Sequence, residues 1–243
     1  MPKSHQPSRA STPAYLYLHG FASSPASTKA TFFKSRLSEL GAEPLVPDLN
    51  QPSFEEMTLT SQLKAASDAL VGLDYSDLVI FGSSLGGLLA TLYAQGCTQA
   101  RALVLLAPGF GLPRRWNDRL GRQGVGHWQS QGYTEVFHHG YNRNSRLRFD
   151  FIVDALKYDT DNVKVSVPTL VFHGRHDQTV PVEESIRFAE SNPDLVKLHL
   201  LDDGHDLIEP LDYMWQITHS FLQEMQLLPA SGPRAGRQEY KVS

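Results

Sequence analysis

The chain has 243 residues and a formal net charge of −4, with 41% hydrophobic and 20% charged residues. These values are typical of a soluble globular protein of one domain that can bury a sizeable core. The slightly acidic balance argues against a nucleic-acid-binding protein, and a single cysteine, Cys97, excludes an internal disulfide. No apolar run is long enough to span a bilayer or to act as a secretory signal, so we expect a cytoplasmic protein.

Short apolar runs alternate with amphipathic stretches, a pattern that favours a mostly parallel sheet with helices on both faces. The expected strands span residues 14–18, 43–46, 78–81, 102–106, 169–172 and 196–200. The expected helices span residues 27–40, 59–71, 85–95, 183–190 and 207–223. Residues 1–13 and 229–243 lack apolar periodicity, so we predict two disordered tails around one domain, residues 14–228.

The alternation is interrupted at about residues 111–161, a segment with many aromatic residues and arginines. This segment connects the expected strand at residues 102–106 to the expected strand at residues 169–172. An insertion there lies above the carboxyl edge of the sheet, where open α/β folds bind ligands. We interpret this insertion as a small helical cap on the α/β domain, although a surface excursion unrelated to substrate would have a similar sequence.

A Gly-x-Ser-x-Gly pattern, Gly82-Ser83-Ser84-Leu85-Gly86, lies between an expected buried strand and an expected helix. A strand and a helix can meet so abruptly only if the residues flanking the turn lack side chains. Ser84 would then expose its hydroxyl at the carboxyl edge of the sheet, as a nucleophile elbow does. Ser83 does not fit the pattern, because Phe81 stands two residues before it.

A serine hydroxyl is a weak nucleophile and needs a base, which a third group must orient. After Ser84, Asp177 follows an expected strand and a glycine turn, and His205 lies on the loop after the last expected strand. The order Ser84, Asp177, His205 is that of the α/β-hydrolases. Taken singly, Asp177 could be only a helix N-cap and His205 a solvated turn residue.

Other acids and histidines lie close to these two residues. Asp202, Asp203 and Asp206 are too near His205 in the chain to come from a separate strand end. His173 and His176 precede Asp177, and we expect both to support its loop.

A hydrolase of this kind also needs an oxyanion hole of preorganised N–H donors. The Leu85 N–H at the start of the helix is one candidate. The Phe21 N–H is the other, because Gly20 allows the loop after the first strand to bend toward Ser84. A His19-Gly20 pair could equally be a simple tight turn.

With these residues assembled, the chain resembles the α/β-hydrolase superfamily. Within it, the chain is similar to small bacterial serine esterases whose first loop reads Leu-His-Gly-Phe-x-Ser-Ser-Pro, here residues 18–25, followed by Lys29-Ala30. The resemblance covers residues 14–225 and implies a Ser84–Asp177–His205 triad with Phe21 and Leu85 as backbone donors. Too few residues precede Ala14 for the first two strands of the superfamily, so we expect a trimmed sheet of about six strands.

The insertion contains seven arginines and three acids between residues 111 and 150, although the whole chain carries −4. This excess of positive charge could attract an anionic ester or thioester. An ordinary solvated surface with arginine stems packed on the core explains it as well.

The sequence therefore predicts a serine esterase that works through an acyl-enzyme on a small-molecule substrate, without metal or organic cofactor. An acyl thioesterase or a carbon–carbon bond hydrolase would use the same triad, and a non-catalytic ligand sensor could retain it. Serine at the elbow argues against an epoxide hydrolase or dehalogenase, which use aspartate there. The sequence does not indicate an oligomeric state.

Overall fold

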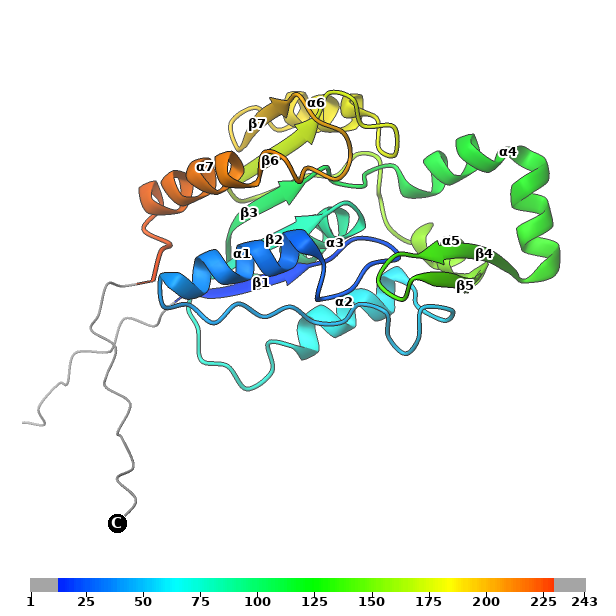
Figure 1. Ribbon diagram of the computed structural model, residues 1–243, viewed down its shortest axis with the longest axis horizontal. Helices are drawn as coiled ribbons and strands as arrows, with labels where there is room; N and C mark the ends of the chain where they lie inside the picture. The colour runs from blue at the N-terminus through cyan, green and yellow to red at the C-terminus, as the bar shows by residue number, and fades with distance from the viewer. Residues whose placement is uncertain (1–12, 230–243) are drawn as a thin grey trace, which may run out of the picture.

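The computed structural model describes residues 13–229, so the predicted tails lie outside the described residues except for Pro13 and Pro229. A five-stranded parallel sheet forms the centre, in the order β1-β2-β3-β6-β7 (Figure 1). Its strands are β1 (Ala14–Leu18), β2 (Leu78–Ser83), β3 (Ala100–Leu106), β6 (Thr169–Gly174) and β7 (Val196–Leu201). Because every neighbouring pair is parallel, all five carboxyl ends meet at one edge.

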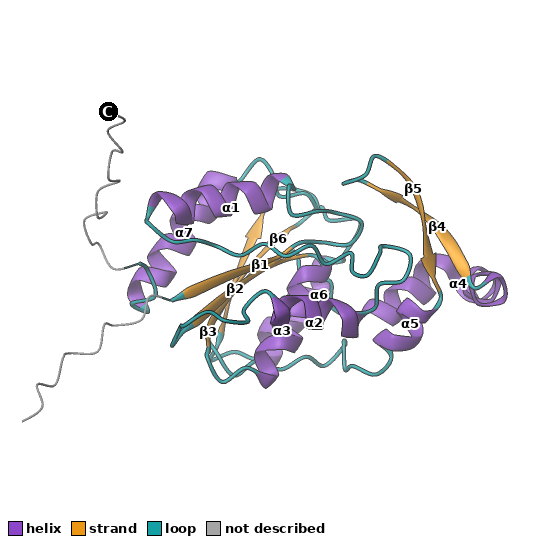
Figure 2. Cartoon of the chain, turned by 90° about the horizontal axis from the view of Figure 1, so that it is seen from below, coloured by secondary structure: helices purple, strands orange, loops and turns teal. Residues whose placement is uncertain are grey.

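Helices cover both faces of this sheet (Figure 2). The helices are α1 (Thr28–Glu39) and α7 (Leu211–Glu224) on one face, and α2 (Leu59–Asp68), α3 (Leu85–Gly96) and α6 (Val182–Ser191) on the other. Alternate residues of β2 point to opposite cores: Val79 and Phe81 pack with α1 and α7, whereas Leu78 and Ile80 pack with α2 and α3. A strand buried on both faces explains why this run is apolar without interruption.

The expected strand at residues 43–46 does not form, and the sheet has five strands instead of about six. Leu45 makes one isolated parallel bridge to Leu16, supported by two backbone hydrogen bonds. Pro47, two residues after Leu45, lacks the N–H that the next hydrogen bond of the ladder needs, so pairing stops after a single residue.

The insertion is not the purely helical cap that the sequence predicts. It comprises α4 (Leu112–Gln131), an antiparallel hairpin of β4 (Tyr133–His138) and β5 (Arg143–Arg148), and α5 (Asp150–Ala155). The helix α4 is interrupted at Gly121, which has non-helical backbone angles. The insertion lies beyond the carboxyl ends of the strands (Figure 1).

The last helix also begins later than the sequence predicts, at Leu211 instead of residue 207. Leu207 has a φ of 49° and Pro210 occupies the N-cap, so the helix begins only after a turn at Glu209 and Pro210, which ends the loop carrying His205. In the part of the chain that the structure describes, no helix combines the length and the apolar character needed to cross a membrane.

Candidate active site

Ser84 occupies the turn between β2 and α3 in a strained backbone conformation. Its φ of 53° and ψ of −118° lie outside the common regions for a residue with a side chain. Hydrogen bonds on both sides hold this conformation. The Ser84 N–H donates to the carbonyl of Leu106 in β3, and the Ser84 carbonyl accepts from the N–H groups of Gly87 and Gly109, all at 2.8–2.9 Å. The turn leaves the Ser84 side chain partly exposed.

Glycines make this sharp turn possible. A Cβ on Gly82 would overlap the backbone of Gly86, and a Cβ on Gly86 would overlap the backbone carbonyl of Leu18 in β1. A Cβ on Gly87 would lie 2.8 Å from the side chain of Pro108. The local sequence therefore brings the Ser84 turn into direct contact with the carboxyl ends of both neighbouring strands.

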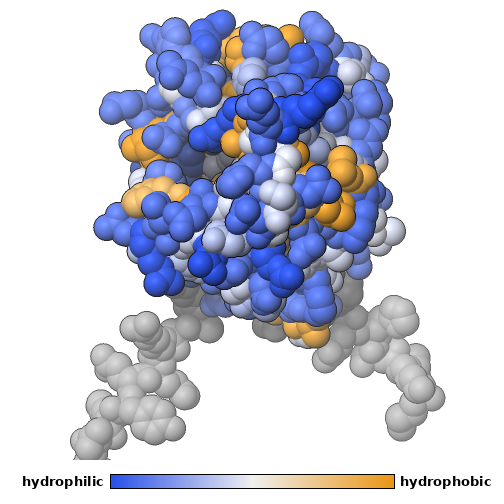
Figure 3. Space-filling model, turned by 90° about the vertical axis from the view of Figure 1, so that its right-hand side faces the viewer, coloured by the Kyte–Doolittle hydropathy of each residue, from blue (hydrophilic) through white to orange (hydrophobic). Residues whose placement is uncertain are grey.

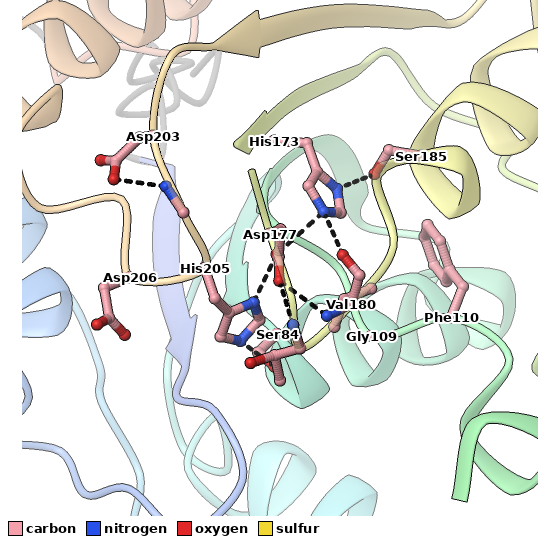
Figure 4. A network of polar contacts seen from close by, with 12 residues as sticks. Ser84, Gly109, Phe110, His173, Asp177, Val180, Ser185, Asp203, His205 and Asp206 are labelled. Atoms are coloured by element: carbon pink, nitrogen blue, oxygen red, sulfur yellow. Dashed lines mark hydrogen bonds and ion pairs between the residues drawn. The ribbon is translucent and has the colours of Figure 1, made fainter. Parts of the chain in front are cut away.

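The structure brings Ser84, His205 and Asp177 together in one chain of hydrogen bonds (Figure 4). The distance from Ser84 Oγ to His205 Nε2 is 3.0 Å, and the distance from His205 Nδ1 to Asp177 Oδ2 is 2.7 Å. An ionised carboxylate can only accept hydrogen bonds, so His205 Nδ1 carries a proton. Nε2 is then free to accept a hydrogen bond from the Ser84 hydroxyl. His205 is one-fifth exposed, whereas the Asp177 side chain is fully buried.

Two features keep the loops of Asp177 and His205 together. Asp177 follows β6, and His205 follows β7, the neighbouring strand of the sheet. A Cβ on Gly174, the last residue of β6, would overlap the backbone carbonyls of Asp203 and Gly204. The two loops can therefore pack in direct contact only because position 174 is glycine.

The Asp177 carboxylate accepts three hydrogen bonds and lies close to a fourth nitrogen. Oδ1 accepts from the backbone amides of Thr179 and Val180, each at 2.8 Å, and Oδ2 accepts from His205 and lies 3.1 Å from His173 Nε2. Burial by itself would raise the pKa of this carboxyl. The contacts with His173, His205 and Val180 outweigh that penalty and hold the pKa of Asp177 well below its usual range.

Of the two histidines expected to support this loop, only His173 reaches Asp177 in this way. His176 is exposed, and its Nε2 lies 2.7 Å from Asp202 Oδ1. Asp203 accepts from the backbone N–H of its neighbour Gly204. The acids beside His205 thus make contacts of their own, and none of these contacts is to the His205 ring.

The loop after β1 lies against Ser84, as the sequence predicts. A Cβ on Gly20 would lie 3.4 Å from the Ser84 Cβ. Among residues 13–229, neither the Phe21 N–H nor the Leu85 N–H donates to another protein group. His19, which is buried, has Nδ1 2.9 Å from the Gly20 carbonyl oxygen, and its Nε2 accepts from the Leu49 N–H at 3.0 Å. In a planar trans peptide, the Phe21 N–H points in the opposite direction from the Gly20 carbonyl. The contact between His19 and this carbonyl therefore also fixes the direction of the Phe21 N–H.

The insertion contacts this loop through aromatic rings. The Phe21 ring lies 5.6 Å from Trp116 of α4 and 5.7 Å from Phe151 of α5, and it also lies 5.4 Å from Phe54. Phe54 and Phe151 are buried, whereas Phe21 and Trp116 are partly exposed. An apolar wall therefore begins next to the candidate oxyanion donor and continues into the insertion.

Several arginines of the insertion already have partners. Arg114 pairs with Asp161 and with the buried Glu184, each at 2.8 Å. Arg115 donates to the backbone carbonyls of Gly109, Phe110 and Thr179. Arg115 therefore connects the start of α4 to the loops next to Ser84 and Asp177.

The face of the molecule in Figure 3 is mostly hydrophilic, with apolar side chains in separate small patches.

Sequence reasoning missed the structural roles of His19, Lys29 and Arg115. Lys29 Nζ donates to the Asp206 carbonyl at 2.6 Å and so anchors the His205 loop to α1. The only available signal for Lys29 was its place in the Lys29-Ala30 pair of the resemblance.

In the described range, no three His, Cys, Asp or Glu side chains lie together in a way that could hold a metal ion.

The chain matches the model described as "Uncharacterised protein family (UPF0227)" over residues 14–223. It is similar in structure to Est1E from Butyrivibrio proteoclasticus with bound ferulic acid (TM-score 0.75, 22% identity, 89% of this chain and 90% of that chain). Mouse alpha/beta hydrolase domain-containing protein 10 is also similar (TM-score 0.74, 20% identity, 89% and 92%). So is the esterase domain of a Rhodothermus marinus protein (TM-score 0.63, 16% identity, 88% of both chains).

No curated protein matches the chain. The structural likenesses confirm the predicted α/β-hydrolase fold, and the sheet order and the position of the Ser84 turn agree with it. The chain belongs to the UPF0227 family and has the α/β-hydrolase fold.

Proposed function

We propose that this protein is a serine hydrolase that cleaves carboxylic esters of small molecules through an acyl-enzyme. The observation that carries the proposal is the chain of hydrogen bonds from the hydroxyl of Ser84, a partly exposed residue, through His205 to the buried side chain of Asp177. Nucleophile, base and orienting acid are each within hydrogen-bond reach of the next, which is the geometric requirement for activating a serine.

In the proposed reaction, His205 Nε2 takes the proton from Ser84 as its Oγ attacks the substrate carbonyl carbon. Asp177 keeps the proton on His205 Nδ1 and stabilises the positive imidazolium. The imidazolium then gives its proton to the leaving alcohol as the ester C–O bond breaks. A water molecule, activated by His205 in the same way, attacks the acyl-Ser84 ester and releases the carboxylic acid, returning Ser84 to its starting state. These steps need no metal or organic cofactor.

The Phe21 and Leu85 N–H groups are the proposed oxyanion donors. Both belong to backbone that contacts Ser84 or follows it directly, and neither is used by another described group. The positive end of α3 adds to the field at Leu85. The contact between His19 and the Gly20 carbonyl supports the assignment of Phe21, because it fixes the orientation of the same peptide.

The aromatic wall from Phe21 to Trp116 favours a substrate with an apolar acyl chain or ring. An esterase domain among the similar structures, and the ferulic acid bound to Est1E, fit this class of substrate. A thioesterase or carbon–carbon hydrolase would need the same residues, so a substrate panel has to separate these activities.

A preference for anionic substrates stays a prediction. Arg114 and Arg115 have partners within the protein, so less positive charge is free for a ligand than the arginine count suggests. If the insertion attracts anions, kcat/KM for anionic esters falls with rising salt and that for neutral esters does not. An equal salt response of both would remove this part of the proposal.

The test is hydrolysis of aryl esters of graded acyl length beside acyl thioesters, with Ser84→Ala as the blank. We expect ester turnover that Ser84→Ala abolishes. Turnover of thioesters alone would favour the alternative enzyme. No turnover of any acyl compound, together with no labelling of Ser84 by a fluorophosphonate, would favour a ligand sensor.

A further inference from the structure

A second histidine contacts the carboxylate that orients His205. His173 lies in β6, four residues before Asp177, and its side chain is fully buried. Its Nε2 is 3.1 Å from Asp177 Oδ2 and 3.0 Å from the Val180 carbonyl oxygen. Figure 4 shows the rings of His173 and His205 on two sides of Asp177. Oδ2 therefore has a nitrogen of one imidazole on each of two sides, at 2.7 Å for His205 and 3.1 Å for His173.

The contacts of His173 indicate where its protons lie. Both neighbours of Nε2, the Asp177 carboxylate and the Val180 carbonyl, can only accept, so Nε2 carries a proton and shares it between them. The Nδ1 atom lies 2.7 Å from Ser185 Oγ in α6, and Ser185 is itself fully buried. A serine hydroxyl can donate to Nδ1, so the ring can satisfy both nitrogens without a net charge.

We propose that His173 is a positioning residue for catalysis: with Ser185, it fixes the direction in which Asp177 Oδ2 faces His205. This inference rests on the proposed function. The backbone amides of Thr179 and Val180 hold only Oδ1. Without His173, the other oxygen has His205 as its single partner, and a rotation of the carboxylate moves the acceptor away from His205 Nδ1.

The burial of the three side chains makes this arrangement specific. Water cannot replace His173 at Oδ2 easily, because Asp177, His173 and Ser185 are all buried. A buried carboxylate oxygen that loses one of its two partners without replacement by water is destabilised. The pair of Ser185 and His173 therefore connects α6 to the catalytic acid through side chains alone.

Three variants separate positioning from simple packing. His173→Phe keeps a flat ring and removes both nitrogens. His173→Gln keeps an N–H donor near the place of Nε2. Ser185→Ala leaves His173 in place and removes only the hydroxyl that orients it. For each variant we measure kcat and KM on the best aryl ester, thermal unfolding, and the low-field proton resonance of the His205–Asp177 hydrogen bond, assigned by its loss in Asp177→Asn.

For His173→Phe we expect kcat to fall about 10- to 100-fold, the effect of losing one hydrogen bond to a charged group, with KM within about threefold of wild type. The low-field resonance should broaden and move upfield because the hydrogen bond is less well fixed. His173→Gln should recover at least part of the lost kcat and the resonance. Ser185→Ala should lose only a few-fold in kcat.

The proposal is overturned if His173→Phe keeps the wild-type kcat, if its resonance is unchanged, or if His173→Gln is as impaired as His173→Phe. If His173→Phe does not fold, Ser185→Ala becomes the decisive variant. An unchanged kcat and an unchanged resonance in Ser185→Ala would then overturn the proposal. The resonance needs no substrate. If the wild type hydrolyses no ester while the resonance still responds to these changes, the proposed function fails and the role of His173 in fixing Asp177 stands.

Discussion

Ser84 Oγ lies 3.0 Å from His205 Nε2, although the two residues are 121 positions apart in the chain. The parallel sheet creates this proximity. Ser84 follows β2 and His205 follows β7, and parallel strands deliver their following loops to the same edge. Asp177 arrives at that edge from β6, directly beside β7, and completes the chain of hydrogen bonds.

Asp177→Asn tests the proposed orienting acid. An amide in place of the carboxylate can present its NH₂ group to His205, which favours the tautomer with the proton on Nε2 and leaves no base for Ser84. We expect kcat to fall by about 10⁴-fold while the fold is retained. Steady-state kinetics and circular dichroism of the variant, with Ser84→Ala as the reference for background hydrolysis, check this. Loss of less than about tenfold would show that Asp177 does not act as the acid.

The depressed pKa of Asp177 predicts how stability depends on pH. A carboxyl whose pKa is lower in the folded than in the unfolded chain stabilises the fold above its unfolded pKa of about 3.9. That contribution is lost as the pH falls below this value toward the folded pKa. The difference in unfolding free energy between wild type and Asp177→Asn should therefore be largest above about pH 4 and shrink in more acidic solution. Urea unfolding of both proteins across this range is the measurement, and a difference independent of pH would contradict the assignment.

Gly86→Ala tests the close packing of the Ser84 turn. The added Cβ overlaps the Leu18 carbonyl, so β1 or α3 must move, at a cost of about 1–3 kcal/mol or more in unfolding free energy. Turnover should fall as well, because Ser84 and the Gly20–Phe21 loop lie at this contact. Gly96→Ala is the matched control, since it lies in the same helix and its Cβ would meet nothing within 4 Å. Equal stability of the two variants by thermal unfolding would contradict this account of the turn.

His19→Phe tests the proposed oxyanion donor at Phe21. The change removes the contacts with the Gly20 carbonyl and the Leu49 N–H, so the Gly20–Phe21 peptide is free to turn. Losing one oxyanion donor costs about 10²–10³-fold in kcat, which sets the upper limit of the effect. We expect a loss below that limit and a parallel loss of affinity for a boronic acid transition-state analogue. An unchanged affinity for the boronic acid would show that this peptide does not bind the oxyanion.

The sequence was sufficient to predict the parts of the fold that place the candidate site. The strands before Ser84 and before Asp177 are buried on both faces, so they appear as apolar runs whose borders differ from the structure by two residues or fewer at each end. The strand before His205 is only partly buried, yet its expected borders differ from the structure by one residue. Glycines at positions 82, 86 and 174 mark the turns because no other residue fits there.

The sequence was a poorer guide where the chain is solvent-exposed or where contacts are not local. The strand β5 reads Arg-Asn-Ser-Arg-Leu-Arg, with only Leu147 buried, so no apolar alternation marks it. The single bridge at Leu45 shows the opposite case, an apolar run that proline prevents from extending. The hydrogen bond from the Leu49 N–H to His19 and that from Arg115 to the Thr179 carbonyl depend on tertiary packing, which no local pattern encodes.

The most direct test of the central claim is labelling of the full chain with a fluorophosphonate probe, followed by intact-mass and peptide mass spectrometry. If Ser84 is activated by His205 and Asp177, the wild type acquires one adduct per chain, located on Ser84, and Ser84→Ala acquires none. His205→Gln should label far more slowly. Absence of an adduct from the folded wild type, or an adduct on a different serine, would contradict the account.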